Sequence, residues 1–504
     1  MQDQTQETAN LDEAIAAIDL GSNSFHMIVA RVQNGNLQII DKLREMVRLG
    51  EGLTPEKDLD PVVAERALAC LERFGQRLGT LPSANVRIVG TNTMRQIKSS
   101  NDFQIKAQQA LGHPIEIIAG REEARLVYLG VAHGLAAGDE PRLVVDIGGG
   151  STELIIGKGF TPYQRESLHM GCVSMSRGFF QDGKISAKAM KQAEIACAVQ
   201  IRPVREQYKH GGWSQAIGSS GTIKAIRKVV IEEGWCEAGI TREALEKLVD
   251  RMIAAGSLEK LTLKGLTDER KPVFPGGVAV LLATFKNLGI KHMQVSYEAL
   301  REGLIYDMIG RIRHEDARER TVNSLAERYN VDREQAQRVN DTAQAFFHQV
   351  IRAWDLSDPR YSAMLSWAAR IHEIGLAVSH SQFHKHGAYL IENADLSGFT
   401  KQEQRVLAAL IRGHRRKFPT AAFESLPNDL VLCTKRLCLL LRLAVLLHRS
   451  RSAVSKPHSL LAAKGNQLSL EFPQGWLENH PLTQAELEQE ANNLKEAGFS
   501  LKFN

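Results

Sequence analysis

The chain has 504 residues, of which 43% are hydrophobic and 24% are charged, and its formal net charge is +5. These are the values of an ordinary globular protein, and the length predicts roughly three or four domains rather than one core. The mild basicity is compatible with a polyanionic ligand but is not diagnostic of nucleic acid, and the six scattered cysteines, without a Cys-x-x-Cys pair, argue against a disulfide scaffold.

The first clear pattern is AAIDLGSNSFHMIVAR, residues 16–31, in which a strand, a tight polar turn and a second strand predict a β-hairpin. The chain then alternates between apolar strand segments and helical segments, as expected of an α/β domain. We expect strands at 36–40, 85–90 and 114–120, an amphipathic helix at 61–78, a polar helix near 101–111 and a helix at 121–134.

A second hairpin, LVVDIGGGSTELIIGK at 143–158, superposes on the first without a gap. Asp19 falls on Asp146, and His26 falls on Glu153. Two matched copies, each opening a strand–helix series, predict a duplicated α/β domain. After the second hairpin we expect a helix near 186–208, a strand at 214–222, a long helix and a strand at 292–303.

The composition changes after about residue 310. The charged run 311–320 is interpreted as a linker or helix start, and 320–455 has apolar residues at helical spacing. The next strand signal is at 466–472, in a small mixed α/β tail. We therefore expect two duplicated domains, at 12–127 and 128–310, a helical domain at 311–457 and a C-terminal domain at 458–504.

No targeting segment is evident in the sequence. The N-terminus is polar and acidic, unlike a secretory signal, and the most apolar late segment, 437–448, is too short to span a bilayer and contains Arg442. With the sparse cysteines, these features predict a cytoplasmic protein without a transmembrane segment, and they leave peripheral contact with the inner membrane face open.

The two hairpin turns are candidate phosphate-binding loops. Glycines and small hydroxyl residues let backbone N–H groups converge on an oxyanion without an obstructing Cβ. A single such turn is equally well a tight turn, but a matched pair across a cleft suits a substrate with several phosphates. The residues concerned are Gly21, Ser22, Asn23 and Ser24 in the first turn, and Gly148, Gly149, Gly150 and Ser151 in the second.

Carboxylates accompany these turns. Asp146 and Glu153 are candidate Mg²⁺ ligands, with Asp19 at the matching position, because Mg²⁺ needs few protein carboxylates. In the alternative interpretation Asp146 accepts N–H bonds within its own turn. In GREEARLVYLG (120–130), Glu122 and Glu123 either serve the helix N-terminus electrostatically or overlook the cleft.

Further candidates follow two strands. Arg95 in TNTMR could grip phosphate oxygens bidentately or form a surface salt bridge. A strand–turn–helix at 216–226 places hydroxyls and a lysine at a helix N-terminus, a natural anion site. Its candidate residues are Ser219, Ser220, Gly221 and Lys224.

The helical region contains His372-Glu373, more histidines at 380–386, and the run RGHRRK at 412–417. The pattern is similar to the metal cage of HD-type phosphohydrolases, but the acid after His372 is not Asp and the late aspartate is missing, with Val445 and Leu446 in its place. We interpret the run as a basic surface; a solvated charge run is the alternative.

The chain resembles the exopolyphosphatase / guanosine pentaphosphate phosphatase family of the actin–Hsp70–sugar kinase superfold, closest to the long bacterial exopolyphosphatases. The motifs are AIDLGSNSFHMIVARV, GREEARLVYLGV, VVDIGGGSTELIIG, MGCVSMSR, AIGSSGTIKAI, ERKPVFPGG and ALREGL, in the family's order, within the first 310 residues. The resemblance implies two actin-like (ribonuclease H-like) α/β domains, a degenerate HD-like helical domain, a small α/β C-terminal domain and a homodimer.

The resemblance also implies hydrolysis of a terminal phosphoanhydride with Mg²⁺, and with K⁺ as a stimulating ion. It assigns Glu123 as the base that activates water, and it associates Asp146 and Glu153 with metal and phosphate handling, so Glu153 joins Glu123 as a catalytic candidate. It matches Arg95, Gly148, Ser151, Ser220 and Gly221 to phosphate-contacting positions. One departure is Ser296-Tyr297-Glu298, where the family usually has a glycine-rich turn before ALREG.

We expect an exopolyphosphatase acting on inorganic polyphosphate, with the rest of the substrate chain held along a basic track. The track candidates are Arg270, Lys271, Arg412, His414, Arg415, Arg416 and Lys417. The nearest alternative is removal of the 5′ γ-phosphate of guanosine pentaphosphate (pppGpp). A non-catalytic polyphosphate or nucleotide sensor, a sugar kinase on the same superfold and an HD-type hydrolase are further alternatives.

Overall fold

The computed structural model describes residues 14–33, 36–79, 81–97, 100–135, 140–312, 317–452 and 459–504. The chain divides into two compact units, with the boundary between residues 316 and 317 of the sequence, and each unit is described by itself below. Part of the charged run that the sequence suggested as a linker, 313–316, lies outside the described residues.

The first unit opens with a five-stranded sheet of order β3-β2-β1-β4-β5, in which β1 pairs antiparallel with β2 and parallel with β4. Its strands are β1 Ile15–Leu20, β2 Phe25–Gln33, β3 Asn36–Glu45, β4 Val86–Gly90 and β5 Glu116–Ile117. Its helices are α1 Pro61–Leu78, α2 Asn92–Gln96 and α3 Ser100–Leu111. The strand expected at 114–120 is thus confirmed only in its middle.

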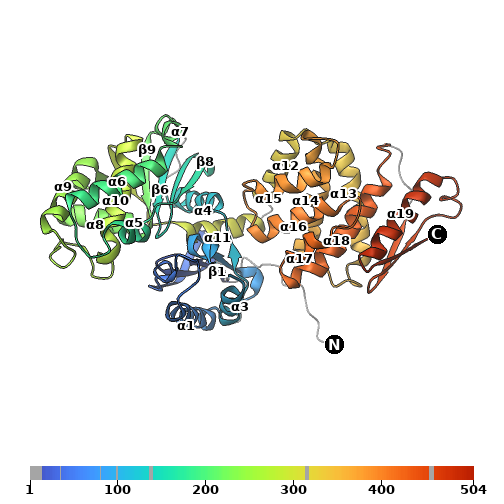
Figure 1. Ribbon diagram of the computed structural model, residues 1–504, viewed down its shortest axis with the longest axis horizontal. Coiled ribbons are helices and arrows are strands. Elements are labelled where there is room, and N and C mark those ends of the chain that lie inside the picture. Colours follow the sequence, from blue (N-terminus) through green and yellow to red (C-terminus); the bar gives the residue numbers. More distant parts are fainter. Residues whose placement is uncertain are drawn as a thin grey trace. The chain divides into compact units, whose positions relative to one another are not determined.

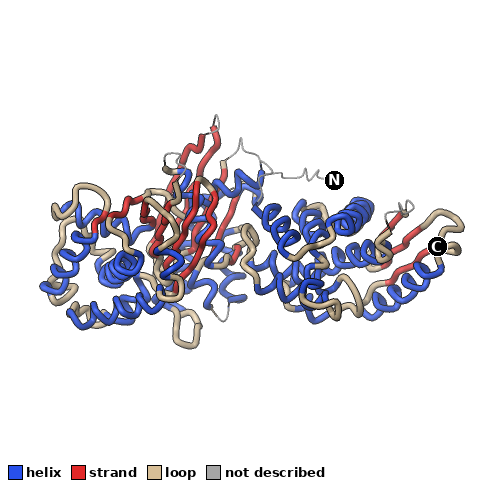
Figure 2. The backbone as a smooth tube through the Cα atoms, turned by 90° about the horizontal axis from the view of Figure 1, so that it is seen from above, coloured by secondary structure: helices blue, strands red, loops and turns tan. Residues whose placement is uncertain are grey.

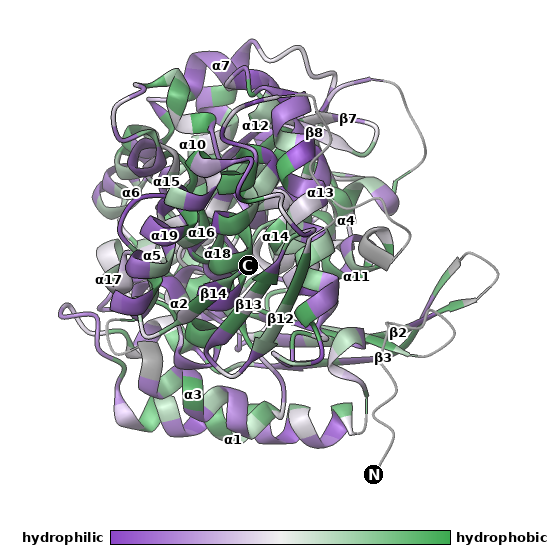
Figure 3. Ribbon diagram, turned by 90° about the vertical axis from the view of Figure 1, so that its right-hand side faces the viewer, coloured by the Kyte–Doolittle hydropathy of each residue, from purple (hydrophilic) through white to green (hydrophobic). Residues whose placement is uncertain are grey.

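Helix α1 has the bounds that the sequence predicts, and its caps explain why. The Asp60 side chain accepts hydrogen bonds from the backbone N–H groups of Val62 and Val63, Pro61 begins the helix, and Gly79 follows it. Hydrophilic and hydrophobic residues alternate along α1 (Figure 3), as is typical of a helix with one buried side.

A second, six-stranded sheet has the order β10-β11-β9-β6-β7-β8. Its strands are β6 Arg142–Ile147, β7 Thr152–Lys158, β8 Thr161–Leu168, β9 Gln215–Ser219, β10 Ile240–Thr241 and β11 His292–Val295. Its helices are α5 Cys172–Phe179, α6 Ala187–Ile201, α7 Arg205–Lys209, α8 Ser220–Glu232, α9 Arg242–Ala255 and α10 Phe274–Leu288.

The two sheets repeat one topology. In each, an antiparallel hairpin leads into a third antiparallel strand, and two parallel strands extend the sheet on the other side of the first strand. The hairpin registers also match, because Asp19 pairs with His26 and Asp146 pairs with Glu153. The duplicated α/β fold expected from the sequence is confirmed.

Two helices, α4 Gly120–His133 and α11 Leu300–Ile312, pack against each other between the two sheets (Figure 1). Their crossing depends on two glycines. A Cβ on Gly303 would lie 1.8 Å from the carbonyl oxygen of Leu126, and one on Gly130 would lie 2.1 Å from that of Ala299. No side chain fits at either position, so the two backbones are in direct contact.

The strand expected at 292–303 is wrong beyond its first part. It ends at Val295, and the chain is helical from Leu300. The buried residues Leu300, Leu304 and Met308 follow a helical spacing that the short strand signal before them concealed. Helix α11 returns the chain to the first sheet, where it contacts β1 and β2.

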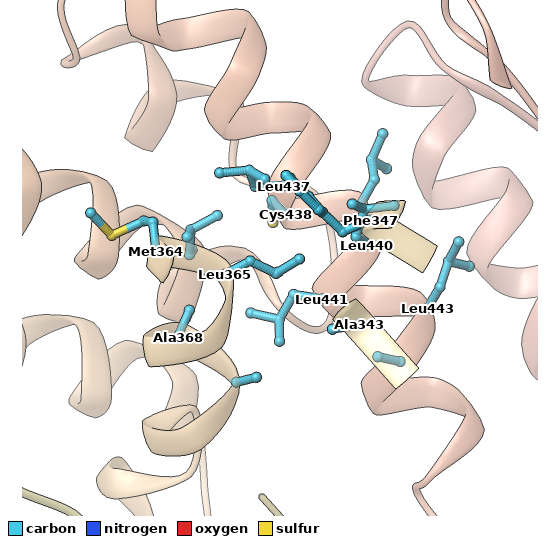
Figure 4. Packing of buried hydrophobic residues seen from close by; sticks show 14 of the residues in the cluster. Ala343, Phe347, Met364, Leu365, Ala368, Leu437, Cys438, Leu440, Leu441 and Leu443 are labelled. Atoms are coloured by element: carbon cyan, nitrogen blue, oxygen red, sulfur yellow. The ribbon is translucent and has the colours of Figure 1, made fainter. Parts of the chain in front are cut away.

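The second unit is helical up to Leu447. Its helices are α12 Ala317–Arg328, α13 Arg333–Val350, α14 Pro359–Ile371, α15 Phe383–Asn393, α16 Lys401–Gly413, α17 Thr420–Glu424 and α18 Asn428–Leu447. Figure 4 shows side chains of α18, such as Leu441, directed between Leu365 of α14 and Ala343 of α13. Helix α18 is the apolar segment noted in the sequence, and none of the described helices is long and apolar enough to cross a bilayer.

Three short strands and one helix complete the second unit beside the C-terminus (Figure 2). They are β12 Leu460–Lys464, β13 Gln467–Glu471, α19 Pro481–Glu496 and β14 Ser500–Phe503. The small mixed α/β tail is confirmed, but its buried residues belong to the same apolar core as the helices. A buried ion pair between Arg442 of α18 and Glu490 of α19 joins the two parts.

Candidate active site

The two hairpin turns face each other across a cavity of about 290 Å³ in the first unit. Most of the residues singled out in the sequence line it. They are Asp19, Gly21, Ser22, Asn23, Ser24, Glu123, Asp146, Gly148, Gly149, Ser151, Ser220, Gly221, Lys224 and Arg270. Residues far apart in the chain are brought together because each turn follows the first strand of its own sheet.

The glycines of the second turn allow the two loops to meet. A Cβ on Gly149 would lie 2.9 Å from the Cβ of Ser22, and a Cβ on Gly150 would lie 2.6 Å from Oδ1 of Asn92. Both separations are shorter than real Cβ contacts, so a side chain at Gly149 would push the two loops apart, and one at Gly150 would displace the Asn92 side chain. The loops therefore present backbone N–H groups and small hydroxyls to the cavity.

The third candidate anion-binding element that the sequence predicts lies at the start of helix α8. Ser220 has a φ of 78°, a left-handed conformation that is rare for residues other than glycine and that recurs at functional sites. Its Oγ donates to the carbonyl oxygen of Ile147 at 2.8 Å. A Cβ on Gly221 would lie 2.1 Å from the Arg270 guanidinium, so this glycine lets Arg270 reach the helix N-terminus.

The two adjacent glutamates of α4 have different roles. Both Oε atoms of Glu122 accept hydrogen bonds from Arg125 at 2.8 Å, and Arg125 also binds Asp307 of α11. Glu122 therefore belongs to a buried network that joins the helices. Glu123 instead lines the cavity, and Arg95 Nη1 donates to its Oε2 at 3.0 Å.

Four buried carboxyl groups gather behind the loops: those of Asp19, Glu123, Asp146 and Glu153. Burial, with added repulsion from Glu123, raises the pKa of Asp19 to about 8 and that of Asp146 to about 7. Burial also raises the pKa of Glu123, against the opposing effect of Arg95, and the pKa of Glu153. Carboxylates this close together repel one another, so binding of a cation, or of a proton to one of them, lowers the free energy of the group.

Four basic side chains also line the cavity: Arg44, Lys224, Arg270 and Arg301. They surround His26, whose pKa is held well below its usual range by burial and by the neighbouring Arg301 guanidinium. His26 is therefore neutral, and its ring nitrogens bind Ser24 Oγ at 2.7 Å and Arg301 Nη1 at 3.2 Å. The cavity lining thus carries both carboxyl groups and basic groups.

Some predicted site residues, phosphate-binding or carboxylate, lie behind the cavity wall instead of forming it. Arg95 is held between Glu123 and the Ile118 carbonyl oxygen, so it positions the glutamate. Ser219 donates to the Glu298 carbonyl oxygen, and Glu153 is buried and accepts from Ser167 Oγ at 2.8 Å. Gly150 packs on Asn92 and, with these three, lies outside the cavity lining.

The predicted basic track is divided between the two units. Arg270 lines the cavity and Lys271 does not, whereas Arg412, Arg415, Arg416 and Lys417 belong to the second unit. The assignment of His414 to a basic surface is wrong, because the side chain is 1% exposed. Its Nδ1 binds the Ile411 carbonyl oxygen at 2.7 Å, and the ring packs at the end of α16.

His414 belongs to a buried group with His372 and His384, where the sequence suggested a degenerate HD-like cage. The ring centroids of His372 and His414 are 5.2 Å apart, and those of His384 and His414 are 6.3 Å apart. Glu373, the acid of this pattern, is paired with Arg451 at 2.5 Å. A guanidinium therefore supplies the positive charge next to this acid.

The fit of Mg²⁺ to the cavity follows from its carboxylates. Asp19 Oδ1 is buried without a hydrogen-bond partner, and Asp146 lies on the cavity wall. Within the described ranges, no three His, Cys, Asp or Glu side chains converge into a complete ion cage. This arrangement fits an ion that takes one or two protein carboxylates and shares its other positions with phosphate and water.

Sequence reasoning missed the cavity residues Arg44, Asn92, Cys172 and Arg301, and it gave His26 no role. Arg301 could have been found, since it lies in the ALREGL motif. Arg44 gave no signal, because it lies near the end of strand β3 with no motif around it, and only the fold directs it to the cavity.

Two family comparisons agree with this geometry. The Ppx/GppA phosphatase family matches residues 28–312, and domain III of Ppx/GppA phosphatases matches residues 317–491. Similar solved structures are an exopolyphosphatase from Cytophaga hutchinsonii (TM-score 0.54, 22% identity, 59% of this chain and 98% of that one) and an exopolyphosphatase-like protein (TM-score 0.53, 24% identity, 59% and 99%). At these identities they show the actin-like fold alone.

Relatives over the whole length have higher identity. The chain is 41% identical over 488 residues to the guanosine-5′-triphosphate,3′-diphosphate pyrophosphatase of Aeromonas hydrophila, with 97% of this chain and 98% of the relative covered. It is 41% identical over 489 residues to the protein of the same name from Vibrio vulnificus, with 96% and 97% covered. The chain belongs to the Ppx/GppA phosphatase family.

Proposed function

We propose that the protein removes the terminal 5′-phosphate of guanosine pentaphosphate, giving guanosine tetraphosphate (ppGpp) and orthophosphate. The sequence favoured inorganic polyphosphate, but the full-length relatives carry a name that refers to the guanosine nucleotide. Both substrates end in the same phosphoanhydride, so the catalytic centre suits either, and the relatives decide our choice between them.

The observation that carries the hydrolytic proposal is the position of Glu123. Its carboxylate lines a cavity bounded by two phosphate-binding loops, and Arg95 holds it in place. In the proposed reaction a water oxygen bonds to the terminal phosphorus, the bond from phosphorus to the bridging oxygen breaks, and the β-phosphate leaves. Glu123 takes the proton of the water, and burial raises its pKa toward the range useful for that transfer.

The surrounding residues stabilise the charge of the transferred phosphoryl group. Backbone N–H groups of the turns at 21–24 and 148–151, with Arg270 and Lys224, neutralise phosphate oxygens without covalent chemistry. We expect Asp146, flanked by Asp19 and Glu153, to hold Mg²⁺. When bound, Mg²⁺ supplies further charge neutralisation at the phosphates.

The proposal is tested by comparing kcat/KM of the purified protein on pppGpp and on long-chain polyphosphate, at the same Mg²⁺ concentration. We expect a preference of at least about tenfold for the nucleotide, which corresponds to about 1.4 kcal/mol. A preference for polyphosphate would instead support the exopolyphosphatase activity that the sequence favoured. No phosphate release from either substrate would support a non-catalytic binding protein.

A further inference from the structure

The turn between β11 and α11 places an exposed aromatic ring at the rim of the cavity. Tyr297 is 68% exposed, which is high for a large hydrophobic side chain. Its sequence neighbours Ala299, Leu300 and Arg301 line the cavity. Lys224, another lining residue, donates from Nζ to the Tyr297 carbonyl oxygen at 2.6 Å. The ring therefore lies just outside the phosphate-binding region.

Hydrogen bonds on both sides hold this turn in one conformation. The Ser296 N–H donates to the Gly218 carbonyl oxygen at 2.9 Å, and Ser219 Oγ donates to the Glu298 carbonyl oxygen at 2.8 Å. The carboxylate of Glu298 lies against Gly134, at the end of α4. A rigid turn loses little entropy when it receives a ligand.

Two cations also fix the Tyr297 ring itself. Arg227 Nη1 donates to its hydroxyl oxygen at 3.1 Å, and Lys224 Nζ lies 5.7 Å from the ring centroid. Lys224 approaches one face of the ring, so the exposed area is left on the opposite face. An aromatic side chain held in this way is a platform on which a planar group can stack.

We propose that Tyr297 is the stacking platform for the purine base of the nucleotide substrate. This inference rests on the proposed function, because inorganic polyphosphate has no base. A nucleotide whose 5′-phosphates occupy the loops extends its nucleoside toward the rim, and base–aromatic stacking needs only the exposed face of the ring. Tyr297 thereby becomes a specificity determinant that separates nucleotides from polyphosphate.

The test uses the full-length protein and two substrates, pppGpp and inorganic tripolyphosphate, which has the same terminal anhydride without a base. In Tyr297→Ala we expect the ratio of KM for pppGpp to KM for tripolyphosphate to rise about 5- to 100-fold, the loss of one stacked base. The effect on kcat for pppGpp should be smaller than the effect on KM. Tyr297→Phe, which keeps the ring but loses the Arg227 bond, should restore the KM ratio.

The matched control is Tyr163→Ala, since Tyr163 on β8 is also exposed (50%) and lies outside the cavity lining. An unchanged KM ratio in Tyr297→Ala, in a protein that hydrolyses pppGpp, would overturn the stacking site alone. A KM that rises equally for both substrates would also overturn it, because the turn would then act through the phosphates. A wild-type protein that hydrolyses tripolyphosphate but not pppGpp would overturn the proposed function together with the stacking site.

Discussion

Arg95 Nη1 lies 3.0 Å from Glu123 Oε2 and 2.8 Å from the Ile118 carbonyl oxygen, so it fixes the cavity glutamate to the backbone before α4. Two effects thus act on Glu123 in opposite directions. Burial raises its pKa and the guanidinium lowers it. The guanidinium thus limits the rise in the pKa of Glu123 that burial causes.

Glu123→Gln should lower kcat on pppGpp by about 10²- to 10⁴-fold, the usual contribution of general-base catalysis. Steady-state phosphate release measures this loss. The thermal midpoint should hold or rise, since the substitution removes one of several buried carboxyl groups. Glu122→Gln should behave in the opposite way, with a lower midpoint and a smaller loss of kcat, because Glu122 serves the Arg125 network. Equal losses of kcat in the two variants would contradict the division of roles.

Arg95→Ala should move the acidic limb of the kcat–pH profile to higher pH. Without the guanidinium, burial raises the pKa of Glu123 further, so a larger fraction of the glutamate is protonated at a given pH below neutrality. We expect a loss of kcat of about 10- to 100-fold, from one charge-assisted hydrogen bond of about 1.5–3 kcal/mol. Arg121→Ala is the control. Arg121 lies on α4, the helix of Glu123, and pairs with Glu166 instead of Glu123. An unshifted limb would remove Arg95 from this role.

Gly303→Ala should destabilise the first unit, because its Cβ would lie 1.8 Å from the Leu126 carbonyl oxygen where α11 crosses α4. The cost of such overpacking is about 1–3 kcal/mol or more, measured by urea unfolding. Gly178→Ala is the matched control in a helix. Nothing lies within 4 Å of its Cβ position, so the change should be neutral or stabilising by about 0.5–1 kcal/mol. Equal effects at the two glycines would refute the close helix crossing.

Removal of divalent ions with a chelator should abolish phosphate release, and Mg²⁺ should restore it. Mg²⁺ should also raise the thermal midpoint of the wild-type protein by binding the native state. Asp146→Asn should lose most of this shift, whereas Asp182→Asn, at an exposed position, should keep it. If both variants respond to Mg²⁺ like the wild type, Asp146 does not hold the ion.

Acidification should destabilise the helical unit. Burial lowers the pKa of His384 to about 4, with contributions from Arg412, Arg415, Lys385 and Arg416, and it lowers the pKa of His372 and His414, although Glu373 opposes it at His372. The unfolded chain therefore binds protons before the native one does, so stability is lost as the pH falls from about 6.5 toward 4.

Hydrogen exchange in α14–α16 of the full chain measures this loss as a function of pH. In His384→Gln the decrease in protection over this range should be smaller than in the wild type, while His380→Gln, at an exposed position, should follow the wild type. Protection that does not change between pH 6.5 and 4 in the wild type would exclude this origin of acid sensitivity.

The parts of the site that follow from local pattern could be predicted from the sequence. The hairpins around Asp19 and Asp146 repeat a strand–turn–strand pattern, and their registers match in the structure. The choice of Glu123 over Glu122 required the resemblance. The structure gives the physical reason, since Glu122 is bound by Arg125 of the same helix, and Arg125 is bound in turn by Asp307, 182 residues further along the chain.

Residues whose role depends on long-range packing could not be predicted. Arg44 reaches the cavity from near the end of strand β3, and His26 lines the cavity with its ring bound by Ser24 and Arg301. The basic run at 412–417 gave the opposite error. Its composition indicated a surface, but folding buries His414.

The central claim is that water, activated at Glu123, attacks the terminal phosphorus of pppGpp. The most direct measurement is ³¹P NMR of the products after single-turnover hydrolysis in H₂¹⁸O. We predict orthophosphate with one oxygen from water, unlabelled ppGpp in equal amount, and formation of both products slowed by at least about 100-fold in Glu123→Gln. Release of pyrophosphate, or label in the nucleotide product, would contradict the account.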